Sequence, residues 1–522
     1  MPTNPRSADM SIPTKQPFPY KILLACFVIA AAFIAVCSKS SFIYPINDWG
    51  DANAYITVAR MMMNGRVLYA DVFEQKGLYL YVFHILATLI SYPSFFGVYL
   101  METLTMTFFL FFAYRSLSLY FPLRLILPVM PLLVFSVAAS LALTHGDSAE
   151  ELMLPFLSYS LYTMLQWAGE EKWGKLPKGS WVLQGIVTAI IFWTKYTILG
   201  FHIGFCVAIL ICAVRNKDYK GLLEIIGLWL IGIVIGSLPA LLYFGLTGSF
   251  SDLFAVYFKS NVVHYAGDAY KTIGDQFTQR WGEGTFLYFG RILLGFLGSP
   301  LMTGLAVAGF WGLGFSCRNP HVKLRTAVHC VYASILLLLI TLPVVYNYYF
   351  LPLSVLAVLG FRYFLSLVKP SVWPSMTLKR SIVITILIMA VLMPRSLASS
   401  QNGYLLIYGR SDLPQYQFRD IIHQTPNPTL LTHANMDHGF QNVAEIVPEH
   451  KYFIATNTYL PERAQAWREM VMEGQVDYII SNNQKLEELY PGMPYDLVKT
   501  IPHPYEGEVC TYRLYRLKEL AP

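Results

Sequence analysis

The sequence predicts an α-helical polytopic membrane protein with a small α/β domain at its C-terminus. Hydrophobic residues make up 55% of the 522 positions, charged residues make up 13%, and the mean hydropathy is +0.46. A chain of this length and composition is too apolar for a water-soluble globule and too long for a single membrane span. Long apolar runs recur up to Arg395, after which the sequence becomes polar.

Eleven apolar segments are long enough to cross the roughly 30 Å of hydrocarbon in a bilayer. We place them at residues 22–43, 94–113, 125–144, 152–168, 181–198, 199–213, 222–246, 292–315, 326–345, 348–366 and 381–397. The first segment has no small-residue cleavage site followed by a soluble sequence, so we interpret it as a retained helix.

The basic residues between these segments indicate the orientation. With the N-terminus in the cytoplasm, the inner loops are rich in Lys and Arg and the short outer turns carry almost none, which is the positive-inside pattern. The basic residues of the inner loops are Arg115, Arg124, Lys172, Lys175, Lys178, Arg215, Lys217, Lys220, Arg318, Lys323, Arg325, Lys369, Lys379 and Arg380. We therefore expect a cytoplasmic tail at 1–20, a transmembrane domain at 21–397 and an extracytoplasmic domain at 398–522.

The first outer loop, residues 44–77, places two carboxylates directly after the first apolar segment. These are Asp48 and Asp51, which lie three residues apart. From Asp51 to Met63 apolar residues recur at helical spacing, so we expect a helix that lies in the membrane interface and ends at the turn Asn64-Gly65. Either aspartate could cap the first turn of this helix or act in catalysis, because the residue type fits both roles.

A resemblance to a known family is carried by this loop. Trp49-Gly50-Asp51, together with Tyr55 and the run at 64–77 that ends in Glu74-Gln75-Lys76-Gly77, resembles the first outer loop of the C-type glycosyltransferases. This family of multi-span enzymes includes the protein mannosyltransferases, the aminoarabinose transferases and related bacterial proteins of cell-envelope glycan synthesis. Residues 146–152 and 193–197 resemble the start of the family's fourth helix and the outer end of its fifth.

The resemblance implies transfer of a sugar from a polyprenyl-phosphate carrier to an acceptor glycan, lipid or protein on the outer side of the membrane. The family's loop aspartate maps onto Asp51, with Asp48 as the nearby alternative, and its lysine near the carrier phosphate maps onto Lys76. Many members have an Asp-Glu pair where this chain has Asp51-Ala52, so a role that requires two adjacent carboxylates does not transfer. Gly77 likewise replaces a proline that often follows the lysine.

The residue types suit this chemistry. An acceptor hydroxyl needs a carboxylate to take its proton as it attacks the anomeric carbon, and we assign this general-base role to Asp51. The leaving lipid phosphate needs fixed cations in a poorly solvated site, for which Lys76 and Lys195 are the first candidates and Arg280 and Arg291 the second. Lys195 could equally be a snorkelling side chain at the end of a span. A single displacement would invert the anomeric configuration.

Other polar and aromatic side chains are candidates for substrate binding: Glu74, Asp147, Glu150 and Tyr69. For the acidic turn the simpler interpretation is structural, because Ser148-x-x-Glu151 fits a capping box at a helix start. Aromatic residues at the outer ends of the spans could stack on a sugar or form an interfacial belt; they are Trp49, Tyr69, Tyr346, Tyr348 and Tyr349. No spacing of ligand residues requires a metal, and we expect neither a metal ion nor a cofactor.

The polar segment after Arg395 predicts a small α/β domain. Residues 429–433 and 476–481 fit buried strands, residues 462–473 fit a helix, and residues 511–517 alternate as a final strand. The segment Met436-Asp437-His438-Gly439-Phe440 follows a strand and could bind a ligand, although Asp and Gly are also ordinary turn residues. We expect a structural or acceptor-positioning role for this domain.

Two other classes of function are open at this stage. A transporter or flippase of polyprenyl-linked glycans would place polar groups near the bilayer midplane, often within internal repeats, whereas here the acids and bases concentrate at the outer mouth. An inactive relative that serves as an assembly partner is the other class, because Ala52 breaks the acidic pair. We expect the bilayer, a lipid-linked donor and an envelope acceptor as partners, and no nucleic acid.

Overall fold

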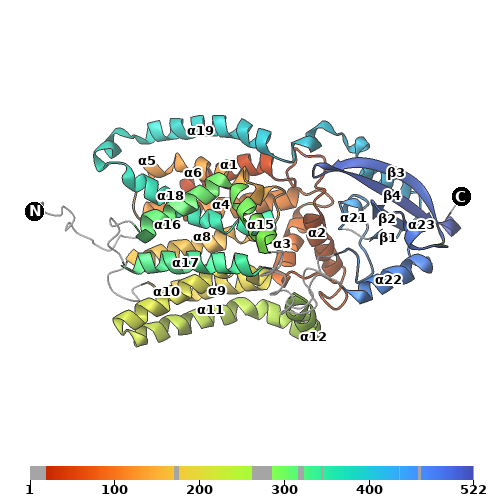
Figure 1. Cartoon of the computed structure of the whole chain (residues 1–522), viewed down its shortest axis with the longest axis horizontal. Coiled ribbons are helices and arrows are strands. Elements are labelled where there is room, and N and C mark those ends of the chain that lie inside the picture. The colour runs from red at the N-terminus through yellow and green to blue at the C-terminus, as the bar shows by residue number, and fades with distance from the viewer. Residues whose placement is uncertain are drawn as a thin grey trace, which may run out of the picture.

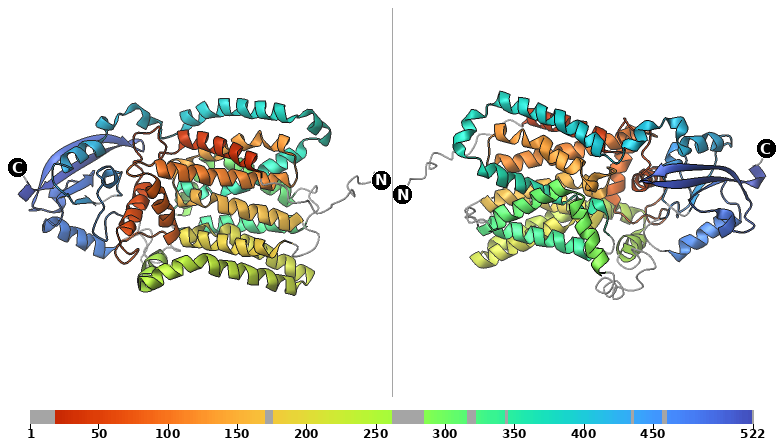
Figure 2. Two further views of the ribbon diagram at one scale, coloured as in Figure 1. Left: turned by 180° about the vertical axis from the view of Figure 1, so that it is seen from behind. Right: turned by 45° about the horizontal axis from the view of Figure 1, so that its top comes forward.

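A helical bundle and a sheet-containing domain lie at opposite ends of the molecule (Figure 1). The computed structural model describes residues 19–169, 176–261, 285–315, 322–342, 345–433, 436–455 and 460–520. Helices α2 (Gly50–Met63) and α3 (Leu78–Ile90) lie between the two parts, as the views in Figure 2 also show. The first outer loop is therefore enclosed between the bundle and the C-terminal domain.

Six described helices are long and apolar enough to cross a membrane, which makes the chain a multi-span membrane protein. They are α1 (Tyr20–Cys37), α4 (Phe96–Ser118), α9 (Lys178–Lys195), α11 (Tyr219–Leu246), α17 (Val322–Thr341) and α19 (Leu378–Ser399). The remaining predicted spans coincide with α6 (Val129–Ala138), α8 (Leu154–Gly169), α10 (Gly200–Asn216), α15 (Thr285–Leu297), α16 (Pro300–Phe310) and α18 (Leu353–Leu367). A total of eleven crossings stays a prediction.

Two of the expected spans differ from the structure. The helix of the first segment ends at Cys37 and not near residue 43. Ser38 and Lys39 leave the helix, and their side chains donate hydrogen bonds to Glu102 of α4 and to Asp48 of the outer loop. The segment at 292–315 is not one straight helix, since α15 and α16 meet at an angle of 98°. Pro300 begins the second helix of this pair, at the first helical position that proline favours.

Small residues allow the bundle helices to approach closely. A Cβ atom on Gly185 of α9 would lie 2.0 Å from the carbonyl oxygen of Trp229 in α11, and one on Gly360 of α18 would lie 2.1 Å from that of Leu305 in α16. Such backbone contacts replace the hydrophobic driving force that a lipid environment does not supply. These close approaches hold α9 against α11 and α18 against α16.

The first outer loop forms a buried helix, α2, where we expected a helix exposed at the membrane interface. Every residue of α2 from Gly50 to Met61 is buried. The guanidinium group of Arg60 donates hydrogen bonds to the carbonyl oxygens of Glu445 and Ile446, which belong to the C-terminal domain. The polar side of the helix therefore faces this domain and not water. Asn64 and Gly65 end the helix as predicted, and the φ of Gly65 is +84°.

The C-terminal domain contains a mixed sheet with the strand order β1-β2-β4-β3 within its described residues. Its strands are β1 (Leu430–His433), β2 (Tyr478–Asn482), β3 (Tyr495–Tyr505) and β4 (Glu508–Leu517), of which β1 and β2 are parallel and the other neighbours antiparallel. Helix α22 (Pro461–Met472) packs on one face and α20 (Pro414–Ile422) on the other. The predicted α/β class, the helix and three of the strands are confirmed, whereas β3 was not predicted.

Short elements complete the described chain. The short α-helices are α5 (Leu123–Ile126), α7 (Ala149–Leu152), α12 (Phe250–Leu253), α21 (Phe440–Val443) and α23 (Leu486–Leu489). The 3-10 helices are η1 (Leu141–Leu143), η2 (Tyr196–Ile198), η6 (Asn347–Phe350), η7 (Pro370–Ser375), η8 (Gly403–Ile407), η9 (Arg410–Asp412) and η10 (Lys518–Leu520), and the π-helical turns are η3 (Phe254–Ser260) and η5 (Trp311–Phe315).

Candidate active site

The two loop aspartates lie in different environments. Asp48 is buried, with Oδ1 2.6 Å from Nζ of Lys39 and Oδ2 accepting a hydrogen bond of 2.8 Å from the hydroxyl of Tyr404. Burial alone would raise the pKa of Asp48, but the charge and hydrogen bond of Lys39 outweigh it and hold the pKa below its usual value. Asp51 lies in the first turn of α2 and faces a cavity. Neither carboxylate caps the helix, which has no side-chain N-cap.

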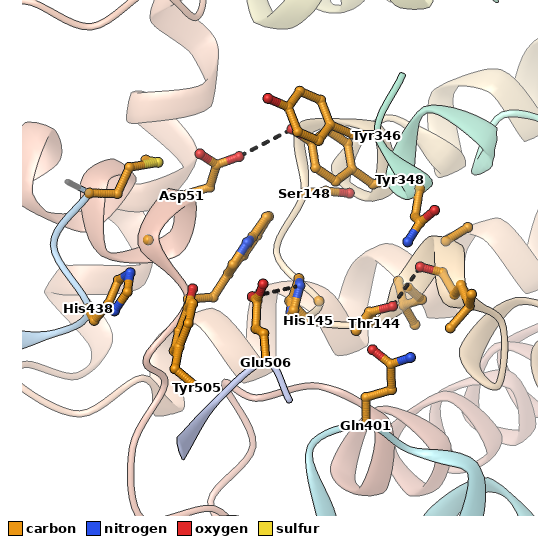
Figure 3. Close-up of a pocket in the computed structure, with 18 residues that line it drawn as sticks. Asp51, Thr144, His145, Ser148, Tyr346, Tyr348, Gln401, His438, Tyr505 and Glu506 are labelled. Carbon is orange, nitrogen blue, oxygen red and sulfur yellow. Dashed lines mark hydrogen bonds and ion pairs between the residues drawn. The ribbon is translucent and has the colours of Figure 1, made fainter. Parts of the chain in front are cut away.

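The cavity beside Asp51, called the Asp51 cavity below, has a volume of about 470 Å³ (Figure 3). It lies between the bundle and the C-terminal domain. Its walls are formed by Trp49, Gly50, Asp51, Leu141, Ala142, Leu143, Thr144, His145, Gly146, Ser148, Tyr346, Asn347, Tyr348, Gln401, Met436, His438, Tyr505 and Glu506. Carboxylate, amide and hydroxyl groups therefore share this space with several aromatic rings, a combination suited to a hydroxyl-rich ligand.

A smaller cavity of about 80 Å³ contains both lysines that the sequence singled out. This lysine cavity is lined by Gln75, Lys76, Thr194, Lys195, Tyr196, Thr197, Tyr257, Asn261, Leu342, Tyr348 and Tyr349. Tyr348 lines this cavity as well as the Asp51 cavity, and its hydroxyl lies 3.5 Å from Oδ2 of Asp51. The aspartate and the two lysines thus meet around one tyrosine.

Backbone contacts bring the two lysines together. The N–H of Gly77 donates a hydrogen bond of 2.9 Å to the carbonyl oxygen of Thr194, which joins the first outer loop to the end of α9. A Cβ atom on Gly77 would lie 2.0 Å from the carbonyl oxygen of Trp193. A proline at this position would lose the donor and meet the same carbonyl, which explains why glycine follows Lys76 in this chain.

Buried neighbours hold Lys76 in place. Glu74 accepts hydrogen bonds from the backbone N–H of Lys76 at 2.9 Å and from its Nζ at 3.1 Å, and also from the hydroxyl of Tyr81. The hydroxyl of Tyr69 donates to the carbonyl oxygen of Lys76 at 2.6 Å, and the Tyr69 ring is stacked against Phe244. Glu74 and Tyr69, expected to bind substrate, line neither cavity and contact Lys76 instead.

Lys195 forms an ion pair with Glu150. Its Nζ lies 2.5 Å from Oε1 of Glu150 and 4.2 Å from the ring centroid of Tyr349. The Glu150 side chain is buried and the Lys195 side chain is only 12% exposed, so Lys195 is not a side chain that snorkels into water. Glu150 also lines a narrow groove of about 20 Å³ whose walls are mostly apolar: Thr197, Ile198, Gly200, Ile335, Leu338, Leu339, Leu342, Tyr349 and Pro352. An apolar groove therefore adjoins the lysine cavity.

Asp147 belongs to a buried polar cluster and lines neither cavity. Its carboxylate lies 3.0 and 3.1 Å from Nε2 of His84, whose Nδ1 lies 2.7 Å from the carbonyl oxygen of Leu80. Because a carbonyl only accepts, Nδ1 carries a proton, and one further proton lies between His84 and Asp147. Burial raises the pKa of Asp147, although His84 opposes this effect. Glu102 accepts a hydrogen bond from the N–H of Asp147 at 2.8 Å.

The remaining predicted residues have these positions. Ser148 Oγ accepts a hydrogen bond from the N–H of Glu151 at 3.1 Å, which confirms the cap at Ser148, whereas the reciprocal bond from Glu151 that would complete the expected capping box is not formed. Arg291 is exposed on α15 and lines neither cavity, and Arg280 falls outside the described residues. Ala52 is fully buried among apolar side chains such as those of Ile56 and Val98, so a glutamate here would bury a charge in an apolar cluster.

Several residues of the site were not singled out from the sequence. From the sequence, Lys39 was expected inside the first span, at 22–43. Nothing in the sequence indicates that Lys39 forms an ion pair with Asp48. His438 and Glu506 reach the Asp51 cavity from loops of the C-terminal domain. His438 lies in a loop that was a candidate for binding, whereas Glu506-Gly507 reads only as a turn. Among the described residues, no group of three or more His, Cys, Asp or Glu side chains could hold a metal ion.

Comparison with known proteins gives a match in fold. The crystal structure of ArnT from Cupriavidus metallidurans bound to undecaprenyl phosphate matches with a TM-score of 0.62 and 12% identity, over 95% of this chain and 97% of that one. The apo state of the same protein matches with a TM-score of 0.65 and 11% identity, over 96% and 99%. Neither family models nor curated proteins give a match to the sequence. The chain therefore has the fold of ArnT, which confirms at the level of the fold the resemblance to C-type aminoarabinose transferases.

Proposed function

We propose that this protein is a glycosyltransferase that moves a sugar from a polyprenyl-phosphate carrier to an acceptor on the outer face of the membrane. The observation that carries the proposal is the junction at Tyr348, where a cavity with a carboxylate meets a cavity with two lysines. A sugar whose anomeric carbon lies at this junction has a base on one side and cations on the other. The fold shared with a protein crystallised with undecaprenyl phosphate supports the choice of donor.

The lysine cavity is the proposed site of the donor phosphate. Lys76 and Lys195, whose side chains are each 12% exposed, place two ammonium groups beside this cavity, where a negative charge is stabilised more strongly than in solution. Thr197, Leu342 and Tyr349 line both this cavity and the apolar groove. The proposed phosphate site therefore adjoins apolar side chains of the bundle, which suit the isoprenoid chain of the carrier. Arg280 and Arg291 stay second candidates for the same phosphate.

The Asp51 cavity is the proposed site of the acceptor. Asp51 takes the proton of the attacking hydroxyl while the acceptor oxygen bonds to the anomeric carbon. The bond from that carbon to the phosphate oxygen breaks, and the lipid phosphate leaves with one more negative charge, which the lysines offset. This single displacement inverts the anomeric configuration. Asp48 is the weaker candidate for the base because its carboxylate is already bound to Lys39 and Tyr404.

The proposal also includes the side of the membrane on which the site lies and the residues that hold the site in place. The outer loops, the active site and the C-terminal domain lie outside the membrane, with the N-terminus in the cytoplasm. Glu74 and Tyr69 position Lys76, and the pair of His84 and Asp147 holds the second outer loop beneath the Asp51 cavity. The reaction proceeds without a metal ion or cofactor.

The proposal is tested by lipid profiling and by reconstitution. A strain that lacks the protein should accumulate a polyprenyl-phosphate sugar, and mass spectrometry of that lipid would identify the donor. The purified full-length protein in liposomes should then release free polyprenyl phosphate from this donor when an envelope extract supplies the acceptor. A flippase would move the intact lipid across the bilayer without cleaving it, so unchanged lipid on the opposite leaflet would contradict the proposal.

A further inference from the structure

The β3–β4 turn of the C-terminal domain reaches into the Asp51 cavity. Tyr505 pairs with Glu508 across a two-residue turn in which Glu506 has φ +51° and Gly507 has φ +87°. These angles fit the tight hairpin turn that favours Asn, Asp or Gly at its first central position. Glutamate is an unusual choice there, and an unfavourable backbone conformation that persists can indicate a functional position. Figure 3 shows Glu506 beside His145 at the cavity wall.

Aromatic contacts fix this turn over the first outer loop. The ring of Tyr505 is stacked on His438, with centroids 3.9 Å apart, and Nζ of Lys39 lies 5.5 Å from the centroid of the Tyr505 ring. Because Lys39 is bound to Asp48 in the loop that carries Asp51, the turn and the candidate base are held by one set of contacts. Glu506 is thus a fixed wall residue, with its side chain about 42% exposed.

The charges around the cavity have one sign. Asp51 and Glu506 both line it, and none of its 18 described wall residues is Lys or Arg. His145 lies 3.3 Å from Glu506, but burial and the charge of Lys39 lower the pKa of His145, which leaves the imidazole neutral at pH 7. Lys39 lies behind this wall, where it is paired with Asp48, and Lys76 and Lys195 lie on the other side of Tyr348, in the lysine cavity. An anion in the Asp51 cavity would therefore meet two carboxylates and no cationic side chain among the described wall residues.

We propose that Glu506 is a second carboxylate of the acceptor site and that this site takes an uncharged, hydroxyl-rich sugar in preference to a phosphorylated one. The inference rests on the proposed function, because it takes the Asp51 cavity as the acceptor site. Carboxylates accept hydrogen bonds from sugar hydroxyls, and the aromatic side chains of Trp49 and Tyr348 line the same cavity, as is common in sites that bind organic ligands. The C-terminal domain thereby contributes to acceptor choice.

Direct binding to the full-length protein in nanodiscs tests this inference. The probes are the methyl glycosides of glucose, galactose, mannose and N-acetylglucosamine, each compared with its 6-phosphate by saturation-transfer NMR. The variants are Glu506→Gln and, as the matched control, Glu508→Gln, which changes an exposed neighbour that does not line the cavity.

The wild type should bind at least one neutral glycoside and bind its 6-phosphate roughly tenfold more weakly, as expected when a charge meets like charges. Glu506→Gln should weaken binding of the neutral sugar by roughly tenfold, since a charged acceptor is lost, and should reduce the discrimination against phosphate. Glu508→Gln should match the wild type. Three results would overturn the inference: no saturable binding of any neutral glycoside, equal or tighter binding of the 6-phosphate, or a Glu506→Gln variant that behaves as the wild type.

This experiment needs neither a donor nor turnover. If lipid-linked sugar is not consumed but neutral sugars bind in the Glu506-dependent manner, the proposed transfer reaction fails and the assignment of the cavity as a sugar site stands. If transfer occurs but sugar binding is independent of Glu506, the proposed transfer reaction stands and the role of Glu506 in the acceptor site fails. The two proposals can thus fail separately.

Discussion

The hydroxyl of Tyr348 lies 3.5 Å from Oδ2 of Asp51 while the Tyr348 ring lies 5.1 Å from Nζ of Lys195. One side chain therefore separates the carboxylate of the Asp51 cavity from an ammonium group of the lysine cavity. This arrangement places opposite charges on the two sides of a single boundary. The displacement proposed above uses such an arrangement, with proton removal on one side and charge stabilisation on the other.

The first prediction concerns Lys76 and Lys195. Lys76→Ala and Lys195→Ala should each raise the KM for the lipid-linked donor more than they change the KM for the acceptor, because each removes a cation from the lysine cavity. The measurement is initial transfer rates in liposomes as a function of donor concentration. Unchanged donor dependence at normal amounts of each variant would contradict the assignment.

A double variant separates charge loss from instability at Lys195. Lys195→Ala leaves Glu150 buried without its partner, and breaking a buried ion pair destabilises a fold by about 3–5 kcal/mol. Lys195→Ala/Glu150→Gln should recover most of the thermal stability and still use the donor poorly. Recovery of donor use in the double variant would show that Lys195 has only a structural role.

The second prediction concerns Gly77. Gly77→Ala should destabilise the protein by about 1–3 kcal/mol, as overpacking does, because the added Cβ meets the carbonyl oxygen of Trp193. It should also lower donor use, because the contact with Thr194 aligns Lys76 with Lys195. The control is Gly179→Ala in the exposed first turn of α9, where nothing lies within 4 Å of the added atom. Equal melting temperatures for Gly77→Ala and the wild type would contradict the close approach.

The third prediction is a pH dependence that comes from His438. Burial lowers the pKa of His438 to about 4 from its ordinary 6.5. A folded pKa below the unfolded one means that the full stability is present above pH 6.5 and is lost as the pH falls toward 4. The difference corresponds to a loss of up to about 3 kcal/mol. His438→Gln should reduce this acid sensitivity. The measurement is the difference in melting temperature between assays at about pH 7.5 and about pH 4.5. If the variant lost stability with falling pH just as the wild type does, His438 would not be the source of the acid sensitivity.

The fourth prediction concerns orientation. A reporter fused after Ser399, at the end of α19, should be extracytoplasmic, and one fused after Lys217, between α10 and α11, should be cytoplasmic. The basic inner loops are the reason for both expectations. Cytoplasmic activity of the Ser399 fusion would contradict this orientation. Because Arg60 of the first outer loop is bonded to the C-terminal domain, it would place both of them on the cytoplasmic side.

The sequence allowed prediction of those parts of the molecule that depend on local pattern. Apolar length predicted the positions of the bundle helices, and the turn residues predicted the end of α2. Lys76 and Lys195, 119 positions apart, were both expected at the outer surface, and the structure places them in one cavity. The bend between α15 and α16 was not predicted, because composition alone does not distinguish one long helix from a bent pair.

What could not be predicted depends on contacts between distant segments. Asp48 and Asp51 have the same chemistry and neighbouring positions, and only the contacts of Asp48 with Lys39 and Tyr404 distinguish them. Helix α2 has an amphipathic pattern that fits a membrane interface, but the C-terminal domain covers its polar side. Glu506 enters the site from a hairpin turn more than 400 residues away along the chain, as the residue numbers show. The pattern of residues within one segment does not predict a contact with a segment so far away in the sequence.

The most direct test of the account is the transfer rate of Asp51→Asn beside that of Asp48→Asn. Asparagine keeps the shape of the side chain but cannot take a proton at neutral pH, so Asp51→Asn should lower the rate by about two or more decades at normal stability. Asp48→Asn should mainly lower stability, since it leaves Lys39 buried without its counter-charge. Single-turnover rates with the lipid-linked donor, measured on equal amounts of folded protein, separate the two effects. Near-normal transfer by Asp51→Asn beside a collapse in folded Asp48→Asn would contradict the assignment of Asp51 as the base.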